Sequence, residues 1–177
     1  MRTSRNRTVR KLTTEEDLYA AAIRSLIRRA HSVFEMRQSL ERRAEDVALV
    51  RRVLVRLKEK KLLDDARYAR EFARSRATHR TQGRFRIARE LRARGVPDRH
   101  IEAALEEAFA ETSEEELLKK RLERKLRLIR GPLDERKRAS LYGSLLRSGF
   151  SSDSIRRAMR GAVGAAELPE TEFVEGE

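Results

Sequence analysis

The chain has 177 residues, with 42 Lys and Arg against 29 Asp and Glu, so its formal net charge is +13. Hydrophobic types make up 39% and charged types 40% of a chain with only three Pro and eight Gly, a composition that favours solvated helices over sheets or disorder. The chain has no Cys, which excludes cysteine nucleophiles and thiolate metal sites, and no apolar run approaches the roughly 20 residues that cross a bilayer, so we expect a soluble cytoplasmic protein.

The first predicted elements are a basic arm, residues 1–13, and a three-helix repeat over residues 14–60. A threonine cap and three acids in the opening turn start its first helix near residue 15. Ser32 can cap the second helix. Apolar residues at helical spacing mark the second and third helices: Phe34, Met36 and Leu40, then Val47, Val50, Leu54 and Leu57.

The second predicted repeat covers residues 61–111. Asp64 and Asp65 are expected to cap its first helix, and residues 78–83 are predicted to form a loop. A second helix runs from Arg84 to Gly95, which suits the left-handed conformation that follows a helix end. Pro97 opens the third helix.

The third predicted repeat covers residues 112–164 and precedes an acidic tail, residues 165–177. Ser113 caps its first helix, which is followed by Gly131-Pro132. A shift of 54 residues aligns the second repeat with the third at apolar and glycine positions: Leu91 with Leu145, Gly95 with Gly149, Val96 with Phe150, Ile101 with Ile155, Ala104 with Ala158, Leu105 with Met159 and Ala108 with Ala162. A shift of 51 aligns the first repeat more loosely.

The predicted fold is therefore all-α, an elongated array of three tandem three-helix repeats. A single irregular helical bundle is the alternative. The basic arm and the acidic tail cancel each other, so the surplus cations lie in the body between them. We expect a polyanion, chiefly nucleic acid, to bind such a body. A membrane surface is a weaker alternative, and an arginine-rich proteome would give the same excess without any binding role.

Arginines dominate the stretch from Arg74 to Arg94, where Glu90 is the single acid. On the helix from Arg84, a rotation of 100° per residue is predicted to turn Phe85, Ile87, Ala88 and Leu91 inward and Arg86 and Arg89 outward. Arginines at i, i+3 and i+7 form a second basic ridge on the preceding helix, and the loop between the two helices carries one more. The candidate binding residues here are Arg67, Arg70, Arg74, Arg80, Arg86, Arg89 and Arg92, whose guanidinium groups suit bidentate contacts with phosphates.

A further basic block runs from Lys119 to Arg130, with seven cations against Glu123 alone. Too few acids lie at i+3 or i+4 to relieve the repulsion, which favours a binding role over a solvated helix face. The candidate residues in this block are Lys119, Arg124 and Arg127. An acidic protein surface would satisfy this block as well as DNA or RNA.

Enzymatic function is not indicated. The three histidines are far apart and lack metal-ligand spacing, and Asp64-Asp65 is better explained as a helix cap than as a magnesium site. The chain has no phosphate-binding glycine loop and no Gly-x-Ser-x-Gly elbow. We therefore expect a non-enzyme without cofactor or metal.

Three segments resemble the core signature of the RecX family of bacterial recombination regulators: residues 62–72 (LLDDARYAREF), 83–91 (GRFRIAREL) and 94–96 (RGV). The resemblance extends over about residues 15–163 and is strongest in the middle repeat. Lys60-Lys61 stands where the family often has a glycine, and the outer repeats match only loosely. The fold implied by the resemblance is an array of tandem three-helix units.

The resemblance implies a modulator of the recombinase RecA. Such a protein is expected to lie in the helical groove of the RecA filament on single-stranded DNA, and to restrain strand exchange, ATP hydrolysis and co-protease activity. The expected partners are thus the RecA filament and single-stranded DNA, with duplex DNA as a further possibility, for a monomer that does not bind membranes.

Two other classes of function stay open. Three-helix units with basic helices resemble helix-turn-helix modules, but direct base readout favours Asn, Gln or Arg, and Asn6, Gln38 and Gln82 are the only amides in the chain. The second alternative is a scaffold whose cations bind an acidic protein.

Overall fold

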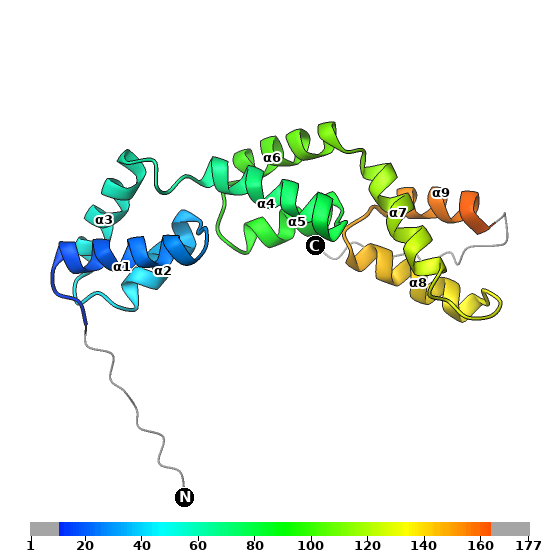
Figure 1. The fold of residues 1–177 in the computed structure, drawn as a ribbon, viewed down its shortest axis with the longest axis horizontal. Helices are drawn as coiled ribbons and strands as arrows, with labels where there is room; N and C mark the ends of the chain where they lie inside the picture. The colour runs from blue at the N-terminus through cyan, green and yellow to red at the C-terminus, as the bar shows by residue number, and fades with distance from the viewer. Residues whose placement is uncertain (1–10, 164–177) are drawn as a thin grey trace, which may run out of the picture. The chain divides into compact units, whose positions relative to one another are not determined.

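The computed structural model describes residues 11–163, and within them the chain forms nine helices and no strand (Figure 1). The helices are α1 (Glu15–Arg28), α2 (Val33–Glu41), α3 (Val47–Glu59), α4 (Asp65–Arg80), α5 (Arg84–Arg92), α6 (Asp98–Glu111), α7 (Glu114–Leu126), α8 (Glu135–Arg147) and α9 (Ser152–Val163). The predicted all-α fold is confirmed. The acidic tail and residues 1–10 of the basic arm lie outside the described residues, so the predictions about them are untested.

The described chain divides into two compact units. The first unit comprises residues 11–69 and 91–101, and the second comprises residues 70–90 and 102–163. Helices α4, α5 and α6 of the middle repeat therefore contribute to both units. The repeat boundaries at residues 14–60, 61–111 and 112–164 stay predictions.

The core of the first unit lies among α1, α2 and α3, which contact one another pairwise. Leu18, Met36, Leu40 and Leu57 are almost wholly buried there. Ser32 starts α2 with a capping box, because its side chain accepts a hydrogen bond from the Glu35 N–H while the Glu35 carboxylate accepts one from the Ser32 N–H. The predicted cap Ser32 thus fixes where α2 starts after the turn that follows α1.

Asp64 precedes α4 and Asp65 is its first residue, and the two aspartates have different roles. Asp64 caps α4, since its Oδ1 accepts from the Ala66 N–H at 2.8 Å and the Arg67 N–H at 3.0 Å. Asp65 Oδ1 instead accepts from the N–H of Val33 at the start of α2, at 2.8 Å. The prediction that both aspartates cap α4 is therefore correct only for Asp64.

Gly95 follows α5 with a positive φ of 67°, as predicted for a residue after a helix end. A side chain at this position would meet the Phe34 side chain, because a Cβ atom would lie 2.4 Å from Phe34 Cγ. The Ser32 hydroxyl donates to the Arg94 carbonyl at 2.6 Å. Residues 91–101 are thus attached to the start of α2 within the first unit.

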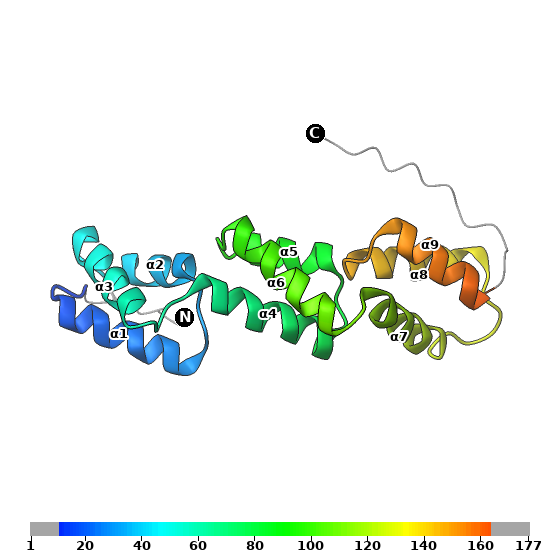
Figure 2. The same ribbon diagram turned by 90° about the horizontal axis from the view of Figure 1, so that it is seen from above.

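The second unit is centred on α7, α8 and α9, which also contact one another pairwise (Figure 2). Several positions that the 54-residue shift aligns have matching environments. Leu91 and Leu145 are fully buried, Ile101 and Ile155 are fully buried, and Gly95 and Gly149 both have positive φ. This internal repeat agrees with the predicted repeat array, although Ala162 is exposed where Ala108 is buried.

A close backbone contact joins the start of α5 to the α8–α9 connection. The Gly83 N–H donates to the Ser148 carbonyl at 2.9 Å, and the Phe85 N–H donates to the Gly149 carbonyl at 3.1 Å. A Cβ atom on Gly83 would lie only 2.3 Å from the Gly149 carbonyl oxygen. Glycine at position 83 is therefore required by the approach of two backbones.

Two local predictions were wrong in this region. Helix α4 continues to Arg80, because Ala73 and Ala77 extend its buried face, so the connection to α5 is only residues 81–83. Phe85 is 66% exposed although it was predicted to face inward. Ile87, Ala88 and Leu91 form the buried arc of α5, and Phe85 lies about 110° around the helix from the centre of that arc.

Replacing Gly83 with Ala is expected to lower the free energy of unfolding by about 1–3 kcal/mol, because the new methyl group overlaps backbone atoms that cannot rotate away. Gly161→Ala is the matched control. No atom lies within 4 Å of a Cβ at Gly161 in α9, so the better helix former should stabilise the chain by about 0.5 kcal/mol. Urea unfolding followed by circular dichroism measures both changes. Equal stabilities for the two variants would contradict the backbone contact.

His31 is expected to make the stability of the first unit depend on pH. It is buried, and its Nδ1 lies 2.9 Å from the Arg29 carbonyl oxygen and its Nε2 3.3 Å from Ser25 Oγ. Burial lowers the pKa of His31 below 6.5, outweighing the Arg29 carbonyl, which raises it. The fold therefore favours the neutral ring, so this stability is present above about pH 6.5 and is lost as the pH falls below that value.

Urea unfolding between about pH 7 and pH 5 tests this dependence. The His31→Gln chain should lose less stability over that interval than the parent chain. His79→Gln, at an exposed position on α4, should keep the parent slope. A His31→Gln chain with the full parent slope would show that other groups cause the pH dependence.

Candidate nucleic-acid interface

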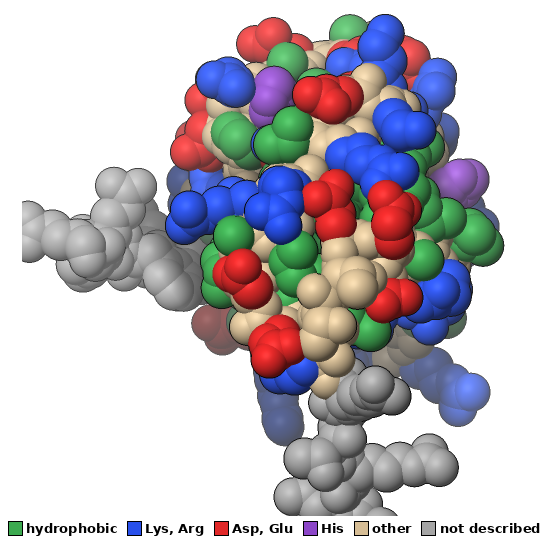
Figure 3. Space-filling view, turned by 90° about the vertical axis from the view of Figure 1, so that its left-hand side faces the viewer, with side chains coloured by type: hydrophobic (Ala, Val, Ile, Leu, Met, Phe, Trp, Pro, Cys, Tyr) green, Lys and Arg blue, Asp and Glu red, His purple; other side chains and the backbone are tan. Residues whose placement is uncertain are grey.

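Several cations of the first unit pair with acids of its own helices. Arg52 Nε lies 2.9 Å from Glu15 Oε2, and Arg56 Nη1 lies 2.6 Å from Glu16 Oε1. The Arg56 guanidinium also stacks on the Tyr19 ring, 4.0 Å from its centroid. In the view of Figure 3, acidic and basic side chains are intermingled over the visible face. The face seen in Figure 3 thus gives no single-sign surface for a polyanion.

The predicted ridge on α4 is exposed but largely compensated. Arg67 donates to the Lys61 carbonyl at 3.1 Å. Arg70 lies 3.9 Å from Glu107, and Arg74 lies 3.2 Å from Glu111. Both glutamates belong to α6, so that helix neutralises much of this ridge.

The predicted candidates on α5 divide into paired and unpaired residues. Arg86 is half-buried, with its Nε 3.0 Å from Glu90 Oε1 and its Nη1 donating to the Arg147 carbonyl at 3.0 Å. It was predicted to point outward, and its side chain is 38% exposed, with the guanidinium held at the end of α8. Arg92 pairs with Asp98 at 2.7 Å. Arg89 is exposed, and no carboxylate of residues 11–163 pairs with it.

The other predicted candidates keep their charge available. Arg80, Lys119, Arg124 and Arg127 are exposed and make no ion pair with any described residue. Arg80 ends α4 rather than lying in a loop. The last three residues lie on α7 and at its C-terminal cap. The ten predicted residues thus contain five whose charge no acid or carbonyl of the described chain meets: Arg80, Arg89, Lys119, Arg124 and Arg127.

The structure also brings together cations that the prediction did not select. Arg121 and Lys125 lie on α7 one helical turn apart, and Arg147 ends α8. With Arg86 and Arg124 they form a group that we call the cation cluster: Arg86, Arg121, Arg124, Lys125 and Arg147. All five interact through their charges, as the pKa shifts of Arg121 and Lys125 indicate.

Arg121 is the most constrained member of the cation cluster. Its Nη1 donates to the carbonyl oxygens of Arg80 at 2.8 Å and Thr81 at 3.0 Å, which fixes the half-buried guanidinium at the end of α4. Its Nε is buried with no acceptor among the described residues. Burial, and then the charges of Arg124 and Arg86, lower the pKa of Arg121. The group therefore carries a charge that its surroundings disfavour.

Lys125 is also partly buried among cations. Burial lowers the pKa of Lys125, and the charges of Arg121, Arg124 and Arg147 lower it further. Glu90 is the only acid found to pair with the cation cluster in the described chain, and it is shared between Arg86 and Arg76. A net excess of positive charge on partly desolvated groups favours a bound anion, and guanidinium groups suit phosphate.

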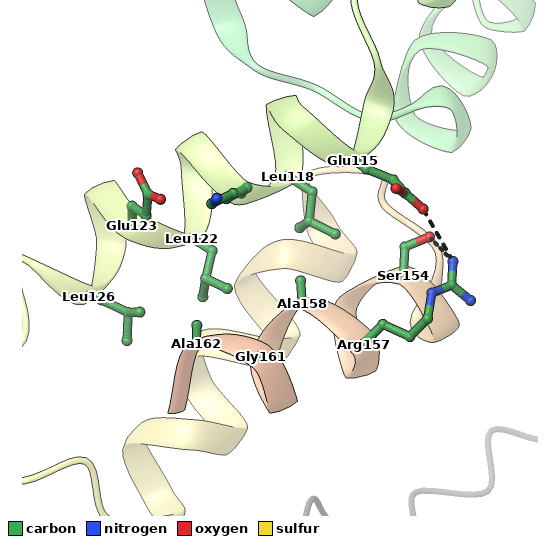
Figure 4. Close-up of a pocket in the computed structure, with 11 residues that line it drawn as sticks. Glu115, Leu118, Leu122, Glu123, Leu126, Ser154, Arg157, Ala158, Gly161 and Ala162 are labelled. Atoms are coloured by element: carbon green, nitrogen blue, oxygen red, sulfur yellow. Dashed lines mark hydrogen bonds and ion pairs between the residues drawn. The ribbon is translucent and has the colours of Figure 1, made fainter. Parts of the chain in front are cut away.

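Helices α7 and α9 enclose a separate apolar groove of about 670 Å³ (Figure 4). Leu118, Leu122 and Leu126 line one side, and small α9 residues, including Gly161, leave space on the other. At its rim, Arg157 lies 3.6 Å from Glu115. Such a groove suits an apolar side chain rather than a phosphate.

No group of three or more metal-ligating side chains comes together in the part of the chain that the structure describes. No described helix is long and apolar enough to span a membrane. We take the cation cluster as the candidate functional site because its charges are partly buried and lack acidic partners other than Glu90 among the described residues.

Lys125→Met is expected to raise the free energy of unfolding at low ionic strength by about 0.5 kcal/mol, because it removes the like-charge contact with Arg121 at i−4. Lys120→Met, at an exposed position on the same helix, should leave the stability nearly unchanged. Added sulfate should reduce the advantage of Lys125→Met by screening and binding. Urea unfolding at two salt concentrations measures these differences, and a Lys125→Met chain that is no more stable would argue against net repulsion.

Comparison with known proteins identifies relatives of this chain. Two family models match it: "RecX, second three-helix domain" over residues 64–105 and "RecX, third three-helix domain" over residues 113–159. The regulatory protein RecX of Halorhodospira halophila is 42% identical over 143 residues, which cover 80% of this chain and 86% of the relative. That of Prosthecochloris aestuarii is 36% identical over 131 residues, covering 74% and 83%.

A solved structure supports the same fold. The crystal structure of RecX from Lactobacillus salivarius matches with a TM-score of 0.71 at 22% identity, over 83% of this chain and 95% of that one. At this identity the likeness concerns the fold alone. With the domain models and the sequence relatives, which confirm the resemblance seen in residues 62–96, the chain belongs to the RecX family of regulatory proteins.

Proposed function

We propose that the chain is a non-enzymatic regulator that binds the RecA nucleoprotein filament in the cytoplasm and inhibits or modulates strand exchange, ATP hydrolysis and co-protease function. It would thereby act in homologous recombination, DNA repair and the SOS response. Membership of a family of regulatory proteins supports the regulatory role. The finer assignment to RecA comes from the resemblance of residues 62–96 to the family, and the cation cluster supports a polyanionic partner such as single-stranded DNA.

The observation that carries this proposal is the uncompensated charge of the cation cluster. A charge that burial and neighbouring cations disfavour lowers stability unless an anion arrives, so the fold retains Arg121 and Lys125 at a cost. The phosphates of a nucleoprotein filament supply anions in a regular row. Asn and Gln, which recognise base edges, are scarce in the chain. Binding to phosphates does not need them, because phosphate contacts carry no sequence information.

An acidic protein surface is the competing partner for the same cations. Nucleic acid releases condensed counterions when its phosphates are neutralised, so the affinity for single strands should fall with salt at a logarithmic slope of about −4 for six phosphates. Absence of DNA binding at low salt would favour the acidic protein partner.

The ion pairs show which arginines can be replaced without disturbing the packing. Arg86→Ala would remove contacts to Glu90 and to the Arg147 carbonyl, so a loss of function there would also reflect altered packing. Arg124 and Arg127 are exposed and pair with no described carboxylate, so their replacement removes charge alone. Arg70 and Arg74, which pair with α6 acids, provide the matched control.

We expect the parent chain to inhibit ATP hydrolysis by RecA on single-stranded DNA. The Arg124→Gln/Arg127→Gln chain should need on the order of tenfold more protein for half inhibition, and its salt slope for single-stranded DNA should be shallower by about 1.4, at 0.7 per lost phosphate contact. The Arg70→Gln/Arg74→Gln chain should stay within about threefold of the parent. Equal inhibition by the parent and the α7 variant would remove Arg124 and Arg127 from the proposed binding site.

A further inference from the structure

Phe85 is an exposed aromatic residue next in sequence to Arg86 of the cation cluster. At 66% exposure it is the most exposed phenylalanine among residues 11–163. It follows directly after Arg84 and directly before Arg86, a member of the cluster. An aromatic ring in water at such a position loses the free energy that burial would provide, so a ligand that covers it would recover that free energy.

The backbone holds Phe85 in a fixed place. The Gly83 N–H donates to the Ser148 carbonyl, the Arg84 N–H to the Glu114 carboxylate at 2.9 Å, and the Phe85 N–H to the Gly149 carbonyl. Three consecutive N–H groups are thus anchored to other elements of the second unit. Only two side-chain torsions of Phe85 remain to be ordered when a ligand covers the ring.

The residues on either side of Phe85 in α5 are cations, Arg84 paired with Glu114 and Arg86 with Glu90. Arg89 lies one helical turn further along the same stripe of α5, exposed and with no ion pair to a described carboxylate. Leu128 is the other large exposed apolar residue of the described part of the second unit, and it follows the C-terminal end of α7. Phe85 is next to Arg84, which pairs with Glu114 at the opposite, N-terminal end of α7. The two ends of α7 are about 20 Å apart by the helical rise, so Phe85 and Leu128 do not form one apolar patch.

We propose that Phe85 stacks on an unpaired base of single-stranded nucleic acid, while Arg89 and the cation cluster bind the neighbouring phosphates. This proposal rests on the proposed function, because it requires that nucleic acid reaches the cluster. Aromatic rings beside cations are the usual elements of single-strand binding, and stacking tolerates any sequence because every base has a flat face. Duplex DNA keeps its bases enclosed, so Phe85 favours the single strand over the duplex.

The chain has no Trp, which makes a specific reporter possible. In the Phe85→Trp chain, oligothymidine should quench the fluorescence of the single tryptophan, because a stacked base quenches the indole. Ile27→Trp is the control, since Ile27 is 78% exposed on α1 of the first unit and should show little quenching. Equal quenching in the two variants, or none in Phe85→Trp under conditions where the strand is bound, would overturn the stacking contact.

A strand without bases separates stacking from charge. Phe85→Leu should bind oligothymidine on the order of tenfold more weakly than the parent chain, the size expected for one stacked base, while Phe85→Trp binds as the parent does. All three should bind an abasic strand of equal length with equal affinity, because its phosphates are unchanged. Circular dichroism should show equal helix content in the three chains.

The outcomes distinguish this inference from the proposed function. If the parent and Phe85→Leu bind oligothymidine equally, the stacking fails while the phosphate contacts stand. If the parent binds neither strand, both proposals fail. If Phe85→Leu inhibits ATP hydrolysis by RecA less well than the parent but binds oligothymidine equally, the ring contacts protein rather than a base, and the stacking is again overturned.

Discussion

The contact between Gly83 and the α8–α9 connection determines where the functional groups of the second unit lie. Two backbones approach so closely that position 83 has no room for a side chain, and two hydrogen bonds hold the start of α5 against residues 148 and 149. This contact fixes the backbone position from which the side chains of Phe85 and Arg86 project, and it brings Arg86 to the Arg147 carbonyl. The cation cluster combines residues of α5, α7 and α8, so it depends on this contact more than on any single charge.

The distribution of acids explains which cations stay available. Helix α6 supplies Glu107 and Glu111 to α4, and α1 supplies Glu15 and Glu16 to α3. Such exposed pairs contribute little stability, but they lower the local excess of charge. Helix α7 differs, because three of its acids are confined to the first turn while its cations follow. Its C-terminal half is therefore left with basic groups, and the negative end of its helix dipole offsets only part of their charge.

The helices, and the caps that Thr14 and Ser32 provide, could be predicted because each depends on residues close in sequence, whereas the predicted cap Ser113 precedes α7 without a side-chain capping hydrogen bond. Gly95 after α5 could be predicted for the same local reason. Phe85 could not be placed by periodicity alone. In α5, a helix of nine residues, the buried arc is narrow, and which residues lie at its edge depends on how the neighbouring helix packs. Asp65 was misassigned for a similar reason, since its partner Val33 is 32 residues away.

The cations show the same difference between features visible in the sequence and features that depend on packing. The basic stretches were visible in the sequence, but the pairing of Arg70 and Arg74 depends on how α6 packs against α4, which composition does not encode. Arg121 was present in a predicted basic block, yet nothing local distinguishes it from its exposed neighbours. Its half-buried state arises from the end of α4, whose carbonyl oxygens at residues 80 and 81 accept its hydrogen bonds.

The cation cluster also spans the two segments that match the family models. Arg86 lies within the second three-helix domain, residues 64–105, and the other four members lie within the third, residues 113–159. The third domain by itself carries four of the five cations, on α7 and at the end of α8. The second domain adds Arg86 of α5, whose guanidinium donates to the Arg147 carbonyl. The junction between the two domains thus adds a cation from another helix to a cluster that the third domain already carries in large part.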